Sequence, residues 1–250
     1  MSQAVYEFPL NEKVRTYLRL EQLFKQLDQC QKMEQDWQYV SFFESLFTLI
    51  DLLERVDIRT DMLRDIEIHE RNLVHWSRHP DIDNEALQST LRQIVNLRER
   101  LKAARKLGVG LKDDKFLASI RQRFSIPGAT CSFDLPNLHF WLKQPKARMQ
   151  SDVQGWMSEV TLVQEAITIT LSFLRERAHF HGITGEKGFY QGVADSKHEL
   201  IRVECSTDQG YYPTLSGNKY RYAIRFYRFE PQQEGVVTQE QDVHFRLASC

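Results

Sequence analysis

The sequence is poor in the features that mark secreted, membrane-spanning and metal-binding proteins. Its 250 residues contain four cysteines, Cys30, Cys131, Cys205 and Cys250, and no Cys-x-x-Cys pair. This spacing is typical of reduced thiols, so we expect a reducing compartment, by default the cytoplasm. The most apolar stretch, 42–53, is interrupted by charged and polar side chains, whereas a membrane span needs about 20 mostly apolar residues. The N-terminus has neither a basic start nor an apolar run, so we expect neither secretion nor membrane insertion.

The chain also lacks an excess of charge of one sign. Lys and Arg total 33 and Asp and Glu total 34, which gives a formal net charge of -1. Proteins that bind nucleic acids usually carry a clear cationic excess. Any recognition of an anion must therefore come from local placement of charge. A hydrophobic fraction of 42% and a charged fraction of 27% are typical of a globular protein.

Signatures of catalysis are missing as well. The stretch 182–188 contains glycines and a lysine, but it has neither the spacing nor the strand–loop–helix order of a phosphate-binding loop. The neighbouring carboxylates of Asp113 and Asp114 lie where the start of a helix favours negative charge, which explains them without catalysis. No nucleophile motif is present. We therefore predict a non-enzymatic protein without a cofactor or a bound metal.

Apolar residues at helical spacing account for most of the first 180 positions. Asn11 is expected to cap the first helix, and Asp113 or Asp114 a later one. Between them, one helix is expected to end at His79-Pro80 and the next to be capped by Asp83. The predicted helices lie near 12–27, 38–55, 60–79, 83–107, 114–126, 137–142 and 151–177, the last with a bend near position 161.

Alternation of apolar and polar residues predicts strands in the remaining segments. The predicted strands are 4–8, 129–135, 200–205, 219–227 and 243–247. Because isolated strands are unstable, we expect the first two to join the C-terminal antiparallel sheet. The predicted fold class is α+β. Its helical domain comprises 11–128 and 136–180, and its β-strand domain comprises 1–10, 129–135 and 181–250.

The predicted strand 219–227 carries a cluster of cations. Alternation places Lys219, Arg221 and Arg225 on one face, and the strand contains no acidic residue to neutralise them. This face is therefore a candidate anion site. Two alternatives remain: the cations could be merely solvated, or the arginines could pair with a carboxylate on a neighbouring strand, such as Glu204. The opposite face is expected to pack into the core through Tyr220, Tyr222, Ile224 and Phe226.

The first helix carries a second cationic pair, Arg15 and Arg19, four residues apart, although Glu12 could neutralise Arg15. Sheets that bind single-stranded nucleic acids combine aromatic rings and cations on one face. Here the rings and cations are expected mostly on opposite faces, with Tyr227 as the exception. An acidic protein segment therefore fits better than a single-stranded nucleic acid, which remains the alternative.

Several strings in this sequence resemble the ZapD family of FtsZ-associated cell division proteins. The first is Phe8-Pro9-Leu10-Asn11-Glu12-Lys13-Val14-Arg15-Thr16-Tyr17-Leu18-Arg19. Others are Arg121-Gln122-Arg123-Phe124-Ser125-Ile126-Pro127-Gly128, Cys131-Ser132-Phe133-Asp134-Leu135-Pro136, Gly188-Phe189-Tyr190-Gln191 and Ala223-Ile224-Arg225-Phe226. The resemblance covers essentially the whole chain and is weakest between about 28 and 110.

The resemblance implies a dimeric accessory protein of the division ring that binds the C-terminal tail of FtsZ, the tubulin-like GTPase, and bundles its filaments. It implies a helical domain joined to a β domain. At position 115 it implies arginine; lysine keeps the charge but lacks the two-pronged guanidinium. The basic residues that it implies for tail binding are Arg19, Lys115, His139, Arg221 and Arg225.

Overall fold

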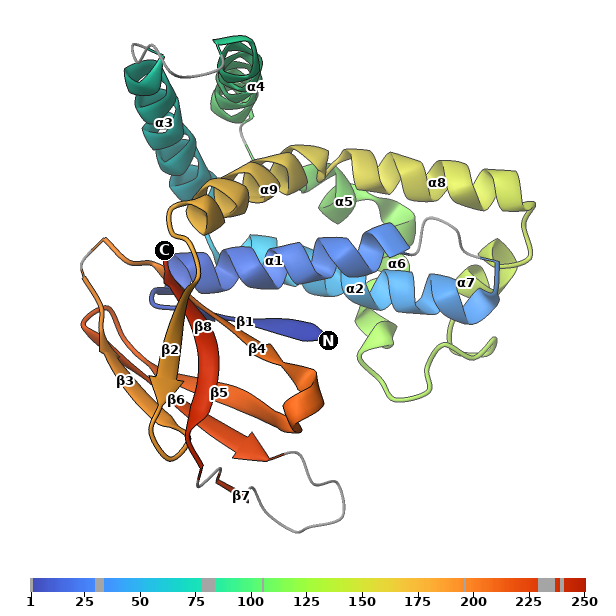
Figure 1. Cartoon of the computed structure of the whole chain (residues 1–250). Helices are drawn as coiled ribbons and strands as arrows, with labels where there is room; N and C mark the ends of the chain where they lie inside the picture. The colour runs from blue at the N-terminus through green and yellow to red at the C-terminus, as the bar shows by residue number, and fades with distance from the viewer. Residues whose placement is uncertain are drawn as a thin grey trace. The chain divides into compact units, whose positions relative to one another are not determined.

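The computed structural model describes residues 2–29, 34–77, 84–104, 106–195, 197–228, 237–238 and 241–250 (Figure 1). The helices are α1 (Glu12–Gln29), α2 (Asp36–Arg55), α3 (Ile58–Trp76), α4 (Asn84–Ala103), α5 (Val109–Asp113), α6 (Lys115–Phe124), α7 (Pro136–Trp141), α8 (Lys146–Ser158), α9 (Thr161–Glu176) and the short 3-10 helix η2 (Thr207–Gln209). The strands are β1 (Gln3–Pro9), β2 (His181–Gly185), β3 (Phe189–Val193), β4 (Leu200–Ser206), β5 (Tyr211–Gly217), β6 (Arg221–Arg228), β7 (Val237–Thr238) and β8 (Val243–Ser249). The predicted α+β class is confirmed.

The described strands form two antiparallel sheets instead of the single sheet that the sequence predicts. The first sheet has the order β1-β4-β8-β2, and the second has the order β3-β6-β5, with β7 paired to β6. The two sheets share one apolar core, in which the rings of Phe226 and Phe245 lie 5.1 Å apart. Alternate residues of β4, β6 and β8 point into this core: Ile201, Val203, Cys205, Tyr222, Ile224, Phe226, Val243, Phe245 and Leu247.

The predicted pairing of the first strand with the C-terminal strands is confirmed. β1 runs antiparallel to β4, with Val5 opposite Glu204 and Glu7 opposite Arg202. The carboxylate of Glu7 accepts hydrogen bonds from both Arg175, at 2.7 and 2.8 Å, and Arg202, at 3.0 Å. These charge-assisted bonds join the end of α9 to the outer face of the first sheet.

The prediction of a strand at 129–135 is wrong, because these residues form turns. The Leu135 N–H donates to the Cys131 carbonyl at 3.0 Å, and this bond closes a five-residue turn. Asp134 accepts a hydrogen bond from Arg123 at 2.8 Å, and the Cys131 thiol lies 3.4 Å from the same carboxylate. Phe133, expected in a sheet, is 83% exposed. Local side-chain bonds thus replace the strand pairing that the alternating pattern suggested.

Helix α2 is central within residues 19–170, and its buried residues include Phe42, Phe43 and Phe47. Its Phe43 ring lies 5.3 Å from Trp141 and 5.5 Å from Trp156, in edge-to-face arrangements. The indole of Trp156 donates to Asp114 at 3.0 Å. Asp114 also accepts from the Leu117 N–H at 2.8 Å, which confirms this residue as the cap of α6.

Two helical predictions need correction. The predicted helix 151–177 is two helices, since α8 ends at Ser158 and α9 begins at Thr161, so the interruption lies where the sequence predicted a bend. The hydroxyl of Ser158 donates to the Gly155 carbonyl at 2.6 Å and competes with the regular helical pattern at this break. The short helix α5 occupies part of the segment where a break was expected. The predicted helix end at His79-Pro80 and the predicted cap Asp83 lie outside the described residues.

The chain divides into two compact units. One comprises residues 1–18 and 171–250, and the other comprises residues 19–170. The first holds both sheets and their shared core, and the second holds the aromatic contacts around α2. A domain is a part of the chain that can fold by itself, and compactness alone does not show this. The predicted domain boundaries therefore stay a prediction.

Glu199 joins three segments of the unit that contains the sheets. Its carboxylate accepts hydrogen bonds from Asn11 at 3.1 Å and from Arg177 at 2.9 Å, and it forms an ion pair with Lys13 at 3.1 Å. Its backbone N–H donates to the carbonyl of Cys250 at 2.6 Å. Burial by itself would raise the pKa of Glu199, but Lys13 and Arg177 outweigh burial and lower it.

Two glycines of the strands give a matched test of packing. A Cβ added at Gly192 would overlap the ring of Tyr222, which is buried in the core, whereas a Cβ at Gly182 would meet no atom within 4 Å. We expect Gly192→Ala to lower the free energy of unfolding by about 1–3 kcal/mol, because the ring must move within a packed core. Gly182→Ala should leave it unchanged or raise it by up to about 1 kcal/mol. Urea unfolding measures both, and equal effects would contradict this packing.

The lowered pKa of Glu199 predicts a dependence of stability on pH. A carboxylate whose pKa is lower in the folded state stabilises the fold above its unfolded value, about 4.5, and this contribution disappears as pH falls through the folded pKa. Glu199→Gln should therefore reduce the free energy of unfolding by about 1 kcal/mol at pH 7 and by less below pH ~4.5. Glu12→Gln, which changes a largely exposed carboxylate, is the control. A loss at Glu199 that is the same at both pH values would refute the prediction.

Candidate anion-binding surface

The candidate surface is the exposed side of the second sheet. Side chains of β6 alternate between faces, so that Tyr222, Ile224 and Phe226 are buried while Arg221 and Arg225 are exposed. The predicted division of this strand into a core face and a cationic one is therefore confirmed for these five residues. We call the exposed side of the second sheet, which includes Arg221, Arg225, Phe189 and Val193, the cationic face.

Lys219 and Tyr220 lie in a turn before β6, so the prediction that they begin this strand is wrong. The side-chain oxygen of Asn218 accepts hydrogen bonds from the N–H groups of Tyr220, at 2.9 Å, and Arg221, at 3.3 Å. Such a local bond favours a turn over a strand. Tyr220, expected in the core, is 66% exposed, and the ammonium group of Lys219 lies 5.0 Å from the centre of its ring.

The two strand arginines are not neutralised from within their own sheet. Strands β3, β5 and β6 contain no Asp or Glu. Glu204, the carboxylate that the sequence offered as a partner, belongs to the first sheet and binds Arg246 at 2.7 Å. Among the described residues, no carboxylate forms an ion pair with Arg221 or Arg225. Of the alternatives that the sequence left open, pairing with Glu204 is therefore excluded.

Apolar side chains accompany the cations on this face. Phe189 lies opposite Arg225, and Val193 opposite Arg221, in the pairing of β3 with β6. Phe189 is 40% exposed and Val193 is 84% exposed. The guanidinium of Arg225 lies 5.6 Å from the centre of the Phe189 ring. The face can therefore contact both anionic and apolar groups.

The expectation that rings and cations lie mostly on opposite faces is therefore wrong at β3 and β5. Phe189 of β3 lies on the cationic face. Tyr212 of β5 lies opposite Tyr227, which is on the same face of β6 as Arg225, and the centres of the two tyrosine rings are 6.1 Å apart. The sequence reading missed β3 because its five residues include a glycine and follow a glycine-rich turn. The signal available in the sequence was the adjacent aromatic residues Phe189 and Tyr190, which favour a strand, but residues 189–193 do not alternate between apolar and polar.

The predicted site residues outside the sheet lie within residues 19–170 and are exposed. Arg19 is on α1, Lys115 is the first residue of α6, and His139 is on α7. Helices α6 and α7 pack against each other through the rings of Phe116 and Trp141, 5.8 Å apart. Lys115 and His139 thus lie on adjoining helices. The structure places Arg221 and Arg225 in the other compact unit, so a single surface that includes all these residues stays a prediction.

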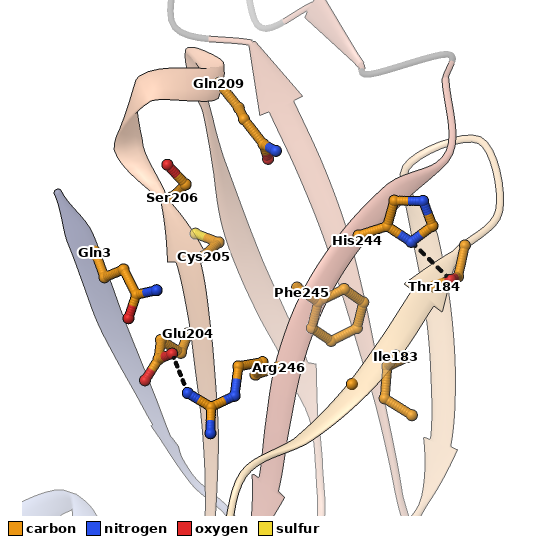
Figure 2. A pocket seen from close by; sticks show the side chains of 11 residues that line it. Gln3, Ile183, Thr184, Glu204, Cys205, Ser206, Gln209, His244, Phe245 and Arg246 are labelled. Atoms are coloured by element: carbon orange, nitrogen blue, oxygen red, sulfur yellow. Dashed lines mark hydrogen bonds and ion pairs between the residues drawn. The ribbon is translucent and has the colours of Figure 1, made fainter. Parts of the chain in front are cut away.

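The first sheet bears a depression of about 360 Å³, lined by both polar and apolar side chains and shown in Figure 2. Figure 2 shows Arg246 turned toward Glu204, with which it forms the ion pair at 2.7 Å. His244 and Thr184 contact each other through Nδ1 and Oγ1 at 2.9 Å. The arginine in this depression is therefore neutralised, unlike Arg221 and Arg225. Arg246 also lies 5.5 Å from the Phe180 ring, so like Arg225 it has an aromatic neighbour, but unlike Arg225 it has an ion pair.

Within the described ranges, no group of three or more His, Cys, Asp or Glu side chains is arranged to hold a metal ion. No helix in that part of the chain is both long enough and apolar enough to cross a membrane.

Comparison with known proteins gives a consistent result over the whole chain. The family model ZapD, described as a cell division protein, matches residues 18–225. A cell division protein ZapD from Shewanella sp. (strain MR-7) is 41% identical over 250 residues, covering 100% of both chains. The protein of the same name from Photobacterium profundum is 40% identical over 245 residues, 98% of each chain. That from Vibrio parahaemolyticus is 38% identical over 250 residues, 100% of each.

Arg246 has an ion pair with Glu204 and Arg225 has none, so we expect the two arginines to contribute differently to the binding of an acidic peptide. We expect Arg225→Gln to weaken binding of a glutamate-rich peptide by about three- to fivefold, the effect of losing one exposed charge contact. Arg246→Gln, the matched control, should leave the affinity unchanged, because its charge is already neutralised by Glu204. Fluorescence anisotropy at low salt measures both. An equal loss in the two variants would show that the peptide responds only to net charge.

Proposed function

This chain belongs to the ZapD family of cell division proteins, and on that premise we propose that it binds the C-terminal tail of FtsZ through a basic surface. We further propose that it acts as a homodimer in the cytoplasm, where it crosslinks and bundles FtsZ filaments at the mid-cell division ring. The observation that carries the proposal is the cationic face, on which Arg221 and Arg225 are exposed without a carboxylate in strands β3, β5 and β6.

The chemistry of the face supports a peptide ligand over a small one. Arg221 and Arg225 lie four residues apart on one strand, and each has an exposed apolar neighbour on β3. An extended acidic segment with interspersed apolar side chains can use both kinds of contact. Arg19, Lys115, His139 and Lys219 are proposed to extend this basic surface, which would lengthen the segment that it can bind.

Bundling requires more than one tail site in each particle. A protein with one site coats a filament, whereas a symmetric dimer presents two identical sites to two filaments. Many weak tail contacts along two filaments then add through effective concentration, so each single site need not bind tightly. This arrangement supports a role in the assembly of the division septum that depends on reversible crosslinks.

A second candidate function is binding of single-stranded nucleic acid. The observation in its favour is that Phe189 and Arg225 lie on the same exposed face, as in sheets that stack bases and pair with phosphates. The formal net charge of -1 opposes it. A shift of short single-stranded oligonucleotides at moderate salt, with no binding of the FtsZ tail peptide, would favour this alternative.

Charge reversal on the strand tests the proposed function directly. We expect Arg221→Glu to abolish co-sedimentation with FtsZ filaments, because a negative charge then repels the acidic tail. The control is Arg92→Glu, an exposed change of the same charge on α4 whose neighbours three and four residues away are uncharged. Both variants should keep the circular dichroism spectrum and the dimer mass of the wild type. Full bundling by Arg221→Glu would exclude this residue from the site.

Ionic strength provides an independent test of the charge contacts. Raising NaCl from 50 to 500 mM shortens the screening length from about 14 Å to about 4 Å, so both tail binding and bundling should weaken. Sedimentation and light scattering of FtsZ filaments with the wild-type chain measure the two effects. Binding that does not change with salt would instead indicate an apolar groove.

A further inference from the structure

Strand β3 forms one edge of the second sheet, and its hydrogen-bonding pattern with β6 is fixed at both ends. The Ala194 N–H donates to the Tyr220 carbonyl at 2.9 Å, and the Phe226 N–H donates to the Gly188 carbonyl at 2.8 Å. In an antiparallel pair, residues that exchange hydrogen bonds alternate with residues whose backbone groups point away from the partner strand. The backbone groups of Gln191 and Val193 are among those that point away from β6.

Gln191 and Val193 therefore offer backbone groups along the open edge. Each has one N–H donor and one carbonyl acceptor that point away from β6. The pairing of the Phe189 N–H with the Glu186 carbonyl, at 2.9 Å, closes this edge at the hairpin that leads into β3. The exposed backbone is thus confined to the part of β3 beside Val193, the most exposed large apolar residue of the strand.

The opposite edge of the same sheet is interrupted by a proline. The Asn218 N–H donates to the Arg221 carbonyl at 2.8 Å, so in β5 it is Thr214 and Ser216 that bond to β6. The backbone of Pro213 then faces outward, and proline has no N–H to offer an added strand. The edge at β3 therefore offers N–H donors where the edge at β5 has a proline, and it is the edge at β3 that lies beside Phe189 and Val193.

We propose that the acidic partner segment binds in an extended conformation as an added strand along the edge of β3. Its backbone would pair with Gln191 and Val193, and every second side chain would lie on the cationic face, beside Phe189 and Val193 and within reach of Arg221 and Arg225. Backbone pairing of this kind supplies affinity, while alternate side chains supply specificity. The inference rests on the proposed function, because it takes the FtsZ tail as the segment that binds.

Substitutions at Val193 separate the backbone from the side chain. Val193→Pro removes the N–H that points to the open edge but none that bonds to β6, and we expect it to weaken binding of the FtsZ tail peptide by about tenfold or more. Val193→Ala keeps the N–H and should weaken binding by much less. Isothermal titration calorimetry measures the affinities. Equal affinities of Val193→Pro and Val193→Ala would overturn the inference.

Modified peptides provide a second test that needs no change in the protein. In an added strand, only alternate N–H groups of the peptide bond to β3. N-methylation at positions of one parity should therefore abolish binding to the wild-type chain, and N-methylation at the other parity should preserve it. Equal effects at both parities would overturn the inference while leaving the proposed function intact. If the unmodified peptide does not bind, the proposed function fails and the inference fails with it.

Discussion

Glu199 is the contact point at which the first and last segments of the unit that contains the sheets are held together. It joins Asn11 and Lys13, at the start of the chain, to Arg177, which follows α9, and its backbone binds the carbonyl of Cys250. The pairing of β1 with β4 extends the same connection. Because these contacts bring together segments far apart in sequence, the entropy of closing the chain must be offset by burial and charge-assisted bonds formed together.

The two sheets use arginine in opposite ways, and strand pairing decides which. On the first sheet, the pairing of β4 with β8 places Glu204 opposite Arg246, so the charge is neutralised within the fold. On the second sheet, β6 lies between strands that contain no acidic residue, so Arg221 and Arg225 face Val193 and Phe189 instead. Exposed arginine is common on protein surfaces, but exposed arginine beside apolar side chains and without a carboxylate is a basis for binding.

How much of this could be predicted from the sequence depends on how local the signal is. The alternating pattern identified β6 and its buried face, and capping chemistry identified Asp114. The same alternation at 129–135 misled, because alternation does not register the backbone bond between Leu135 and Cys131 that closes a turn there, or the bond of Asp134 to Arg123, which lies outside the segment. Strand β3 was missed since it is short and contains a glycine that only the ring of Tyr222 explains. The neighbours of Arg221, Arg225 and Arg246 are set by pairing between strands that are distant in sequence, so they could not be predicted from the local pattern.

An open edge such as that of β3 also exposes a protein to unwanted pairing with its own copies. Pairing two copies through β3 would join two faces that each carry Arg221 and Arg225 and whose strands contain no carboxylate, which like-charge repulsion disfavours. An acidic segment at the same edge meets opposite charge. In the proposed pairing the arginines have two roles at this edge: they attract an incoming strand of negative charge, and they repel the same edge of a second copy, without a proline of the kind that β5 contains.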